Sequence, residues 1–430
     1  MELVKMQRYE SYRDSGVDWI GIVPTHWSVT RLGSLFEERR TKVSDEDFPP
    51  LSVTKNGILP QLDSAAKTKD GDNRKLVKAG DFVINSRSDR KGSSGVSDRN
   101  GSVSLINIVL KPRNVLPKFC NYVLKSNAFI EEYYRVGRGI VADLWTTRYD
   151  EMRTMMLVIP PSQEQTAIAN FLDQKTAQID EAIAIKERQI ELLKERKQII
   201  IQKAVTQGLN PNVPMKDSEV EWIGKVPKHW IVSKIGMYSK VFNGSTPNRE
   251  ISRYWLNGTI PWISSGKVND FIVNEPSEYI SESALRECSL RVFPKGTIII
   301  GIVGQGKTRG TTARLNLDTT INQNVAGIIP SKFLSSDFLH LYLIQAYSQI
   351  RNQGQGSNQE ALNCSIVSSF PVVIPAMEEQ QKIIEFIENQ SLLIEQSISI
   401  QAEQIEKLKE YKTTLINSAV TGKIKVTDEN

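Results

Sequence analysis

Residues that carry chemistry or cross-link small domains are scarce in this chain of 430 residues. Its three cysteines, Cys120, Cys288 and Cys364, are odd in number and widely spaced, which argues against a disulfide framework or a zinc knuckle and for a reducing compartment. The three histidines, two of which belong to one repeated motif, leave little for a metal cluster or a catalytic triad. Nothing in the sequence therefore assembles a reaction centre.

Long apolar runs are absent as well. No stretch is long enough to cross a membrane, and the first ten residues, MELVKMQRYE, lack the apolar core of a signal peptide. We therefore expect a cytoplasmic protein with no membrane contact. A chain of this length exceeds a single ordinary hydrophobic core, so two or more domains are expected.

Glycine and proline are missing from residues 163–207, which lie within the segment from Pro160 to Leu209. Apolar residues recur there at spacings of three and four, with charged residues and glutamine between them, which predicts a long helix with one narrow apolar stripe. Gly208 and Pro211 predict where the helix ends. About 42 residues at about 1.5 Å per residue span about 60 Å, and such a helix cannot bury its stripe alone.

The segment from Pro375 to Ile424 repeats this pattern without a gap, 215 positions further along the chain. An ungapped repeat of this length indicates a duplication. Because the two apolar stripes match, we favour antiparallel pairing of the two helices within one chain. The alternatives are that each helix packs on its own half or on a second chain.

The net charge of +5 is unevenly spread along the chain. Residues 163–209 hold seven acids and seven bases, whereas residues 378–424 hold eight acids and five bases, a net charge of −3. The remainder of the chain therefore carries +8. Basic globular parts joined by neutral or acidic helices suit domains that meet an anionic polymer, although this excess is small for two domains.

A second duplication opens each half of the chain. Trp19–Trp27 reads WIGIVPTHW, and Trp222–Trp230 reads WIGKVPKHW. We call each copy of this motif a brace, because its tryptophans and prolines are expected to dock the first strand of each half by packing. A catalytic role for His26 or His229 is the alternative.

Between each brace and the next long helix lies an insert, residues 31–159 in the first half and 234–374 in the second. The two inserts share little sequence, but both predict strand, long loop, strand, basic loop, strand, helix and final strand. The elements expected in the first insert are strands at Leu51–Val53, Asp81–Asn85, Val103–Leu110 and Met155–Ile159 and a helix at Pro117–Tyr134. Those expected in the second are strands at Ile260–Ser264, Thr297–Val303, Asn324–Ile329 and Val372–Ile374 and a helix at Ser336–Ile350.

The expected fold is therefore an α/β (α+β) tandem pseudo-two-fold repeat of two globular domains, each followed by a long helix, with the helices paired as an antiparallel coiled coil. The predicted division is a first domain over residues 1–159, a helix over 160–209, a second domain over 210–374, a second helix over 375–424 and a tail over 425–430.

Basic side chains gather among glycine and serine in one loop of each insert. Flexible small residues let a backbone approach phosphates, and arginine can read guanine edges in a major groove. The alternative is a solvated surface loop. The residues predicted to contact DNA are Arg87, Arg90, Lys91, Arg99 and Arg138 in the first insert and Asn243, Ser245, Thr246, Lys267, Lys307, Arg309 and Arg314 in the second.

A rival interpretation concerns the basic loop of the second insert. Gly301–Thr308 matches G-x-x-x-x-G-K-[ST], the phosphate-binding loop of NTPases, and follows an expected strand. Lys307 would then bind phosphates, and Thr308 would bind Mg²⁺. We do not favour this P-loop, because Gly310 and the neighbouring threonines start helices poorly and the first insert lacks the pattern.

Taken together, these motifs resemble the specificity subunits of type I restriction-modification systems. The resemblance covers essentially the whole chain, although the first insert has no clear counterpart of GSTP or of YW-x-x-G-x-IPW. The residues that carry it are the two braces, FNGSTPN (Phe242–Asn248), YWLNGTIPWISSGKV (Tyr254–Val268) and the P-x-x-x-EQ-x-x-I-x-x-F start of each long helix (Pro160–Phe171 and Pro375–Phe386).

The resemblance implies two target recognition domains, each of which reads one half of a bipartite asymmetric site in double-stranded DNA. It also implies that the long helices dock two modification subunits, which bind S-adenosylmethionine and methylate adenine. Separate restriction subunits would use ATP and Mg²⁺, so the chain itself would hold no cofactor, metal or active site. A non-catalytic coiled-coil adaptor is the remaining alternative. The residues expected on the docking helices are Ile168, Phe171, Ile183, Ile190, Leu193, Ile383, Phe386, Ile398, Ile405 and Leu408.

Overall fold

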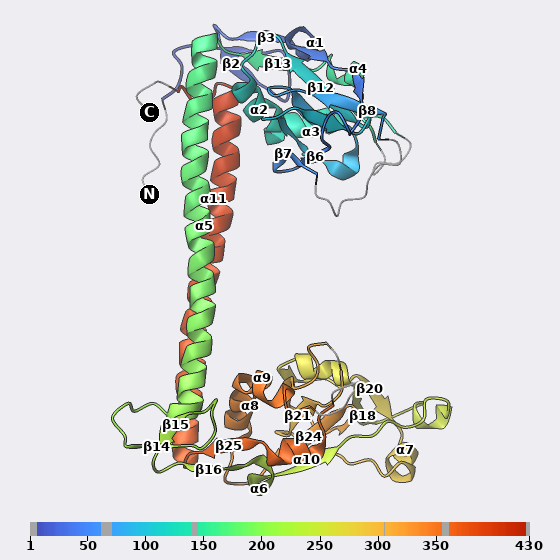
Figure 1. Ribbon diagram of the computed structural model, residues 1–430, viewed down its shortest axis with the longest axis vertical. Helices are drawn as coiled ribbons and strands as arrows, with labels where there is room; N and C mark the ends of the chain where they lie inside the picture. The colour runs from blue at the N-terminus through green and yellow to red at the C-terminus, as the bar shows by residue number, and fades with distance from the viewer. Residues whose placement is uncertain (1–6, 62–70, 140–144, 305, 355–360, 427–430) are drawn as a thin grey trace. The chain divides into compact units, whose positions relative to one another are not determined.

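The chain forms two compact units, each of which contains one brace, one insert and part of both long helices. Unit 1 consists of Met1–Glu187 and Ala402–Asn430, and unit 2 consists of Arg188–Gln401. The predicted division along the chain follows sequence order rather than contacts, and it stays a prediction. The computed structural model describes residues 7–61, 71–139, 145–304, 306–354 and 361–426 (Figure 1).

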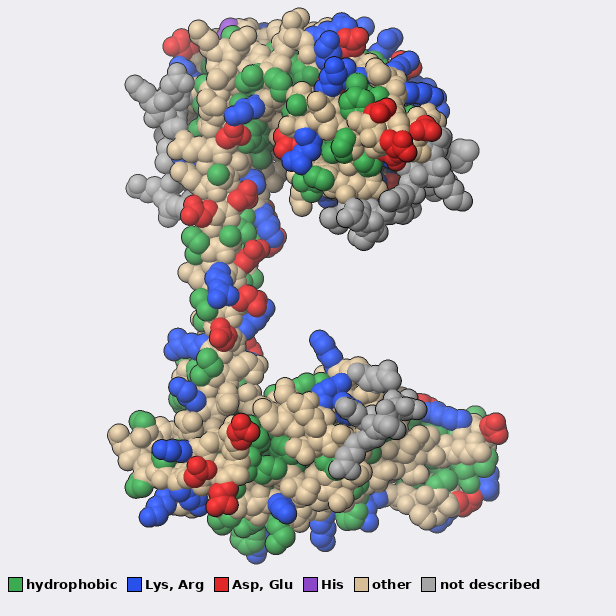
Figure 2. Space-filling view, in the orientation of Figure 1, with side chains coloured by type: hydrophobic (Ala, Val, Ile, Leu, Met, Phe, Trp, Pro, Cys, Tyr) green, Lys and Arg blue, Asp and Glu red, His purple; other side chains and the backbone are tan. Residues whose placement is uncertain are grey.

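The long helices are α5, Ser162–Gln207, and α11, Met377–Val420, and within each unit they run antiparallel (Figure 1). No glycine or proline interrupts either helix. Both helices expose charged side chains of both signs (Figure 2), and each buries a narrow apolar stripe. The predicted fold class is confirmed, including the pairing of the two helices within one chain.

The stripes are most deeply buried where the helices also meet an insert. Ion pairs cross between the helices in both units: Lys412 Nζ lies 2.6 Å from Asp180 Oδ2, and Lys197 Nζ lies 2.6 Å from Glu395 Oε1. These exposed pairs contribute little stability, so the apolar contact holds the helices together. The buried stripe residues are Ile168, Leu172, Ile179, Ile405 and Leu415 in unit 1 and Ile201, Ile383, Ile387 and Ile394 in unit 2.

Unit 1 folds its insert around a four-stranded sheet of order β10-β9-β12-β4 and a three-stranded sheet of order β11-β8-β5. The pairs β1-β2, β6-β7 and β13-β3 complete it, and all of these ladders are antiparallel. The strands are β1 Tyr12–Asp14, β2 Ile22–Pro24, β3 Ser28–Arg31, β4 Phe36–Glu38, β5 Lys42–Val43, β6 Leu51–Thr54, β7 Gly57–Pro60, β8 Arg74–Val77, β9 Phe82–Asn85, β10 Ser94–Val96, β11 Gly101–Val103, β12 Asn107–Pro112 and β13 Met156–Ile159. The short helices are α1 Leu32–Leu35, α2 Pro117–Lys125, α3 Asn127–Arg135 and α4 Tyr149–Met152.

Unit 2 repeats this plan with a five-stranded sheet of order β17-β24-β21-β22-β19 and a three-stranded sheet of order β20-β18-β23. The pairs β14-β15 and β16-β25 correspond to β1-β2 and β3-β13. The strands are β14 Met215–Asp217, β15 Lys225–Pro227, β16 Ile231–Lys234, β17 Ser239–Asn243, β18 Ile260–Ile263, β19 Ile272–Val273, β20 Glu278–Ile280, β21 Ile298–Gly301, β22 Thr312–Leu315, β23 Thr320–Ile321, β24 Val325–Pro330 and β25 Pro371–Ile374. The short helices are α6 Ile235–Tyr238, α7 Glu282–Glu287, α8 Ser336–Gln345, α9 Tyr347–Arg351 and α10 Cys364–Ser369.

The predicted strands and helices of the inserts are found in the predicted order, but the predicted long loop of each insert contains further elements, β7 and β8 in the first and β19, β20 and α7 in the second. Three predicted segments are also wrong in detail. The strand predicted at Val103–Leu110 is two strands, β11 and β12, because a turn in which Asn107 N donates to Ser104 O separates them. The helix predicted at Pro117–Tyr134 is interrupted by Ser126, whose hydroxyl caps α3. The helix predicted at Ser336–Ile350 is likewise divided, at Ala346.

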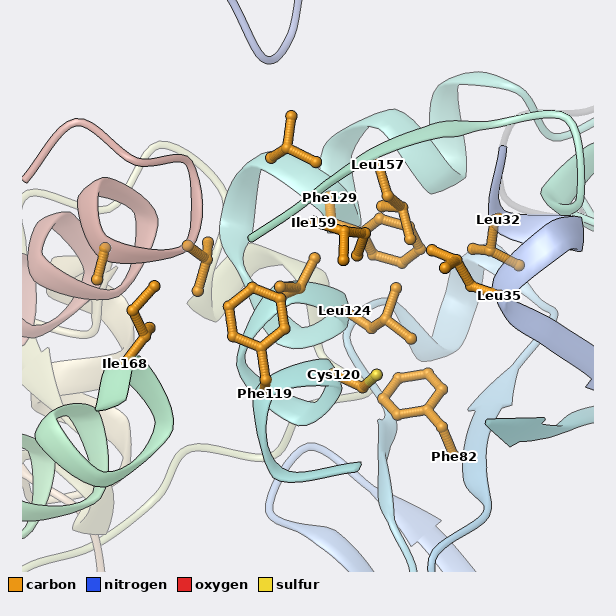
Figure 3. Close-up of a cluster of buried hydrophobic side chains, with 14 of the residues drawn as sticks. Leu32, Leu35, Phe82, Phe119, Cys120, Leu124, Phe129, Leu157, Ile159 and Ile168 are labelled. Carbon is orange, nitrogen blue, oxygen red and sulfur yellow. The ribbon is translucent and has the colours of Figure 1, made fainter. Parts of the chain in front are cut away.

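The core of unit 1 joins its insert to α5. Phe82 from β9 faces Cys120 and Leu124 from α2, and this group continues through Phe119 toward Ile168 on α5 (Figure 3). All five side chains are at most 2% exposed. The insert and the start of the long helix therefore fold around one shared core.

Both braces pack against the first turn of a long helix. Trp27 and Trp230 are each 1% exposed, so the tryptophans fill the core as expected. His26 Nε2 lies 2.7 Å from a carboxylate oxygen of Glu164, and His229 Nε2 lies 2.9 Å from one of Glu379. The structural role predicted for the braces is confirmed.

The residue that follows each of these glutamates ties the helix to the insert. Gln165 accepts a hydrogen bond from Leu116 N at 2.8 Å, just before α2 begins. Gln380 accepts one from Ser335 N at 2.7 Å, just before α8 begins. Both amides also donate to the backbone immediately before their own helix, so each glutamine links two helix starts.

The third histidine, His340, lies in the core of unit 2. It is 2% exposed, its ring lies 4.7 Å from that of Phe271, and its Nε2 faces Thr312 O at 3.3 Å. Its pKa is lowered from 6.5 to about 4, mainly by burial and also by Arg314, whereas Thr312 O and Asp337 oppose the shift. Among the helices that the described residues form, none has the length and apolarity that a membrane span requires.

We predict that Glu164→Ala destabilises unit 1 by about 2–4 kcal/mol, whereas Glu379→Ala destabilises unit 2 by only about 1 kcal/mol. Glu164 accepts hydrogen bonds from Tyr9 and Trp27 in addition to its contact with His26, whereas Trp230 Nε1 has no partner among the described residues. Amide hydrogen exchange resolved along the chain measures the loss in each unit. Equal losses in the two units would contradict the prediction.

We also predict that the free energy of unfolding of unit 2 falls by about 2 kcal/mol between pH 7 and pH 5 through His340 alone. Because the pKa of His340 is lower in the folded state, the unfolded chain binds the proton first. Stability is therefore complete above pH 6.5 and decreases until the pH reaches about 4. Unfolding of wild type and His340→Phe at both pH values checks this, since the variant should lose that part of the pH dependence.

Candidate nucleic-acid interface

The basic loop of the first insert joins β9 to β10 at one edge of the four-stranded sheet. Its residues Arg87, Arg90 and Lys91 are exposed. Arg87 and Arg138 both form a backbone bridge with Thr146. The structure therefore brings Arg138, which is remote in sequence, to the same loop.

Ion pairs hold part of this cationic group in place. Lys91 Nζ lies 2.6 Å from Glu131 Oε2, and Arg138 Nε lies 3.7 Å from Glu151 Oε1. Both cations remain about half or more exposed, so each pair is weak and a phosphate can replace the carboxylate at small cost. Among the described residues, Arg87 forms no ion pair.

Arg99 lies elsewhere in the first insert. It follows β10 on the turn toward β11, and both ends of its guanidinium group bind Asp98, at 2.6 and 2.8 Å. This pair holds the pKa of the Asp98 carboxyl below its ordinary value. The structure thus does not gather Arg99 with Arg87, Arg90 and Lys91.

In the second insert the corresponding loop joins β21 to β22 and contains Lys307 and Arg309. Lys307 is exposed, whereas Arg309 is only 8% exposed. Arg314 lies on β22, and its Nε donates to Asp337 Oδ1 at 2.8 Å. Of these three predicted contact residues, only Lys307 is exposed, while Arg314 is partly buried.

The polar residues around FNGSTPN lie at the end of β17. Asn243 donates its amide to the carbonyls of Gln323 and Val325, at 3.3 and 3.2 Å. Thr246 Oγ1 also contacts the side chain of Gln323, while Ser245 N donates to the backbone of β23. Arg249, which is not among the residues predicted to contact DNA, follows this motif. It stacks 3.6 Å over the ring of Trp255 and binds both carboxylate oxygens of Glu278.

Lys267 lies apart from the basic loop, in the short 3₁₀ helix Ser265–Asn269, and pairs with Asp270 at 2.9 Å. Nothing in its contacts joins it to Lys307.

The segment Gly301–Thr308 is not a P-loop. A P-loop lysine and threonine open a helix, whereas here the chain turns back through Gly310, whose N–H donates to Gly301 O, and enters strand β22. Gln305 lies outside the described residues. Because no helix N-terminus follows to bind phosphates, Gly301–Thr308 matches the P-loop motif in sequence but not in structure.

The histidines and cysteines lie apart from any candidate metal site in the part of the chain that the structure describes. No group of three or more His, Cys, Asp or Glu side chains there could hold a metal ion. Burial raises the pKa of the Cys120 thiol, which makes it a poor nucleophile.

The residues predicted for docking on the helices divide into buried and partly exposed groups. Ile168, Phe171, Ile383 and Ile405 are at most 6% exposed, so they pack inside the units. Phe386 is 38% exposed, although it corresponds to the buried Phe171. The remaining five, Ile183, Ile190, Leu193, Ile398 and Leu408, are partly exposed.

Apolar residues that are more exposed than the predicted set lie beside the stripes. These residues were not predicted, because they do not recur at the spacing of the stripe. They are Ile185, Leu192 and Ile199 on α5 and Leu392, Leu393 and Ile400 on α11, each between 44% and 57% exposed.

Comparison with known proteins agrees with this architecture. Residues 227–410 match the family described as the Type I restriction modification DNA specificity domain. The chain is 36% identical over 172 residues to the type I restriction enzyme MjaIX specificity subunit of Methanocaldococcus jannaschii, a match that covers 37% of this chain and 38% of that protein. It is 22% identical over 437 residues to the putative type I restriction enzyme MjaX specificity subunit of the same organism, covering 95% of this chain and 96% of that protein.

A solved structure shares the fold. This structure comes from work on the complex assembly and conformational transition of the type I R-M system. It superposes on this chain with a TM-score of 0.69 at 15% sequence identity, and the match covers 93% of this chain and 98% of that one. Residues 227–410 therefore resemble the type I restriction modification DNA specificity domain, and the chain as a whole is similar in length and sequence to a putative specificity subunit and shares the fold of a solved chain.

Proposed function

We propose that this chain is the DNA sequence-recognition subunit of a type I restriction-modification complex, with each insert reading one half of a bipartite asymmetric site. The observation that carries the proposal is the basic loop on each insert. The two loops follow equivalent strands, β9 and β21, and their sequences differ. The first loop exposes Arg87, Arg90 and Lys91, and the second exposes Lys307. Like scaffolds with unlike loops suit two modules that read different sequences.

We propose further that the long helices dock two modification subunits, and that restriction subunits join the same assembly. The exposed apolar residues on α5 and α11 support this, because water-exposed isoleucine and leucine on a helix favour a partner surface. S-adenosylmethionine, ATP and Mg²⁺ would belong to these partners. This chain would then act in the cytoplasm without an active site of its own.

Exchange of an insert tests the modular assignment. Replacing residues 31–159 with the insert of another family member should change only one half of the methylated sequence, because each insert is proposed to read its half alone. Mapping of methylated adenines in cells that carry the chimaera and the modification subunits measures this. A change in both halves, or in neither, would refute the modular assignment.

Lys307→Ala should weaken DNA binding by the assembled complex several-fold on all sequences and lower the dependence of log K on log salt by about 1, as expected for a lost phosphate contact. Lys228→Ala, which removes an exposed lysine from the second brace, is the matched control and should leave both quantities unchanged. Titration of labelled duplex at several salt concentrations provides the measurement.

The same proteins separate the proposed function from its alternatives. The isolated chain should not hydrolyse ATP, and hydrolysis that Lys307→Ala abolishes would restore the NTPase interpretation. A coiled-coil adaptor would show no salt-dependent DNA affinity even with the modification subunits bound.

A further inference from the structure

The two basic loops end in the same way although their sequences differ. Gly92 closes the loop of the first insert with φ +79°, and Gly310 closes that of the second with φ +84°. A residue with a side chain is strained at such a positive φ, whereas glycine is not. A Cβ at Gly310 would lie 3.2 Å from the side chain of Arg351 on α9, and one at Gly92 would lie 3.8 Å from Ile130 on α3. Each loop therefore turns back against a short helix of its insert, α3 in the first and α9 in the second.

A tyrosine from that short helix holds the middle of each loop. Tyr134, on α3, donates its hydroxyl to Arg90 O at 3.3 Å. Tyr347, on α9, donates its hydroxyl to Lys307 O at 3.2 Å. In both cases the acceptor is the main-chain carbonyl of an exposed cation, so the contact orients the backbone without occupying the charged side chain.

The start of each loop is held by the segment that follows the same helix. Thr147 N donates to Ser86 O, and Leu362 N donates to Ile302 O, both at 2.9 Å. Each loop is thus fixed at its start by a backbone contact, in its middle by a tyrosine hydroxyl and at its end by a glycine turn. Three matching contacts in inserts of low sequence similarity indicate one shared device.

Further contacts reinforce the tyrosine in each insert. Lys91 Nζ lies 5.9 Å from the ring centre of Tyr134. Arg351 Nη1 donates to Arg309 O at 2.8 Å and to Tyr347 Oη at 3.3 Å. A glycine- and serine-rich loop would otherwise lose much conformational entropy on binding, and prior ordering removes that cost.

We propose that Tyr134 and Tyr347 are positioning residues, which hold the DNA-reading loop of each insert in its binding conformation without contacting DNA themselves. This inference rests on the proposed function. In this proposal, cations such as Arg90 and Lys307 contact DNA, and the tyrosine hydroxyls orient the backbone that carries them. Because each tyrosine serves one loop, its removal should affect one half-site only.

The first test needs no DNA. Trypsin cleaves after lysine and arginine, so limited proteolysis of the full chain reports how often the loop opens at Arg90 or Lys307. Tyr134→Phe should speed cleavage after Arg90, and Tyr347→Phe should speed cleavage after Lys307, each by about 3- to 10-fold. Matched controls are Tyr149→Phe and Tyr342→Phe, which remove hydroxyls that donate to the carbonyls of Phe36 and Pro371, away from the loops.

The second test measures binding by the complex with its modification subunits. The probe is a labelled duplex that carries the sequence identified by methylation mapping, together with two duplexes in which one half-site is scrambled. Each loop variant should bind the intact duplex about 3- to 10-fold more weakly, with an unchanged salt dependence, because no phosphate contact is lost. The loss should disappear on the duplex whose corresponding half-site is scrambled.

The outcomes separate the two proposals. Loop variants that match their controls in cleavage, or that open faster yet bind the intact duplex like wild type, overturn the positioning role. A wild-type complex that does not prefer the mapped duplex overturns the proposed function instead. In that case the cleavage rates still decide whether the tyrosines hold the loops.

Discussion

The Glu-Gln pair in the first turn of each long helix is the contact on which the rest of the structure depends. Glu164 and Glu379 bind the braces, while Gln165 and Gln380 bind the backbone at the start of α2 and α8. Two adjacent side chains thereby join three parts that are far apart in sequence. Because the pair lies at a helix N-terminus, the carboxylate also meets the favourable end of the helix dipole. The orientation of each insert on its helix follows from these bonds.

Much of this arrangement could be predicted from sequence, since it rests on periodic or repeated signals. The apolar spacing of the long helices predicted α5 and α11, and the repeated tryptophans predicted packed braces. The main strands of the inserts followed from short apolar runs between turns, whereas short strands such as β8 and β20 were missed. The Glu-Gln pair stood out in the sequence as a shared motif. Its hydrogen-bond partners could not be predicted, because Leu116 and Ser335 belong to no recognisable sequence pattern.

The candidate site was less accessible to prediction from sequence, because the burial of a charge depends on tertiary neighbours. Arg309 and Lys307 are two residues apart, but only Lys307 is exposed. Arg314 has a carboxylate partner on α8, and Arg99 has one beside it. Phe171 and Phe386 occupy equivalent positions in the two helices, yet only Phe171 is buried. Composition identifies such residues as cationic or apolar, and packing decides which of them a partner can reach.

The division of the long helices between the units has a consequence for synthesis of the chain. Unit 2 is one continuous segment, Arg188–Gln401, so all of its residues are synthesised before the last part of unit 1. The core of unit 1 needs Leu415, Ala419 and Val420, which pack with residues from the N-terminal half. The first insert must therefore wait, with an incomplete core, while the second can already fold. A frameshift or stop codon near residue 400 would spare the second insert and damage the first.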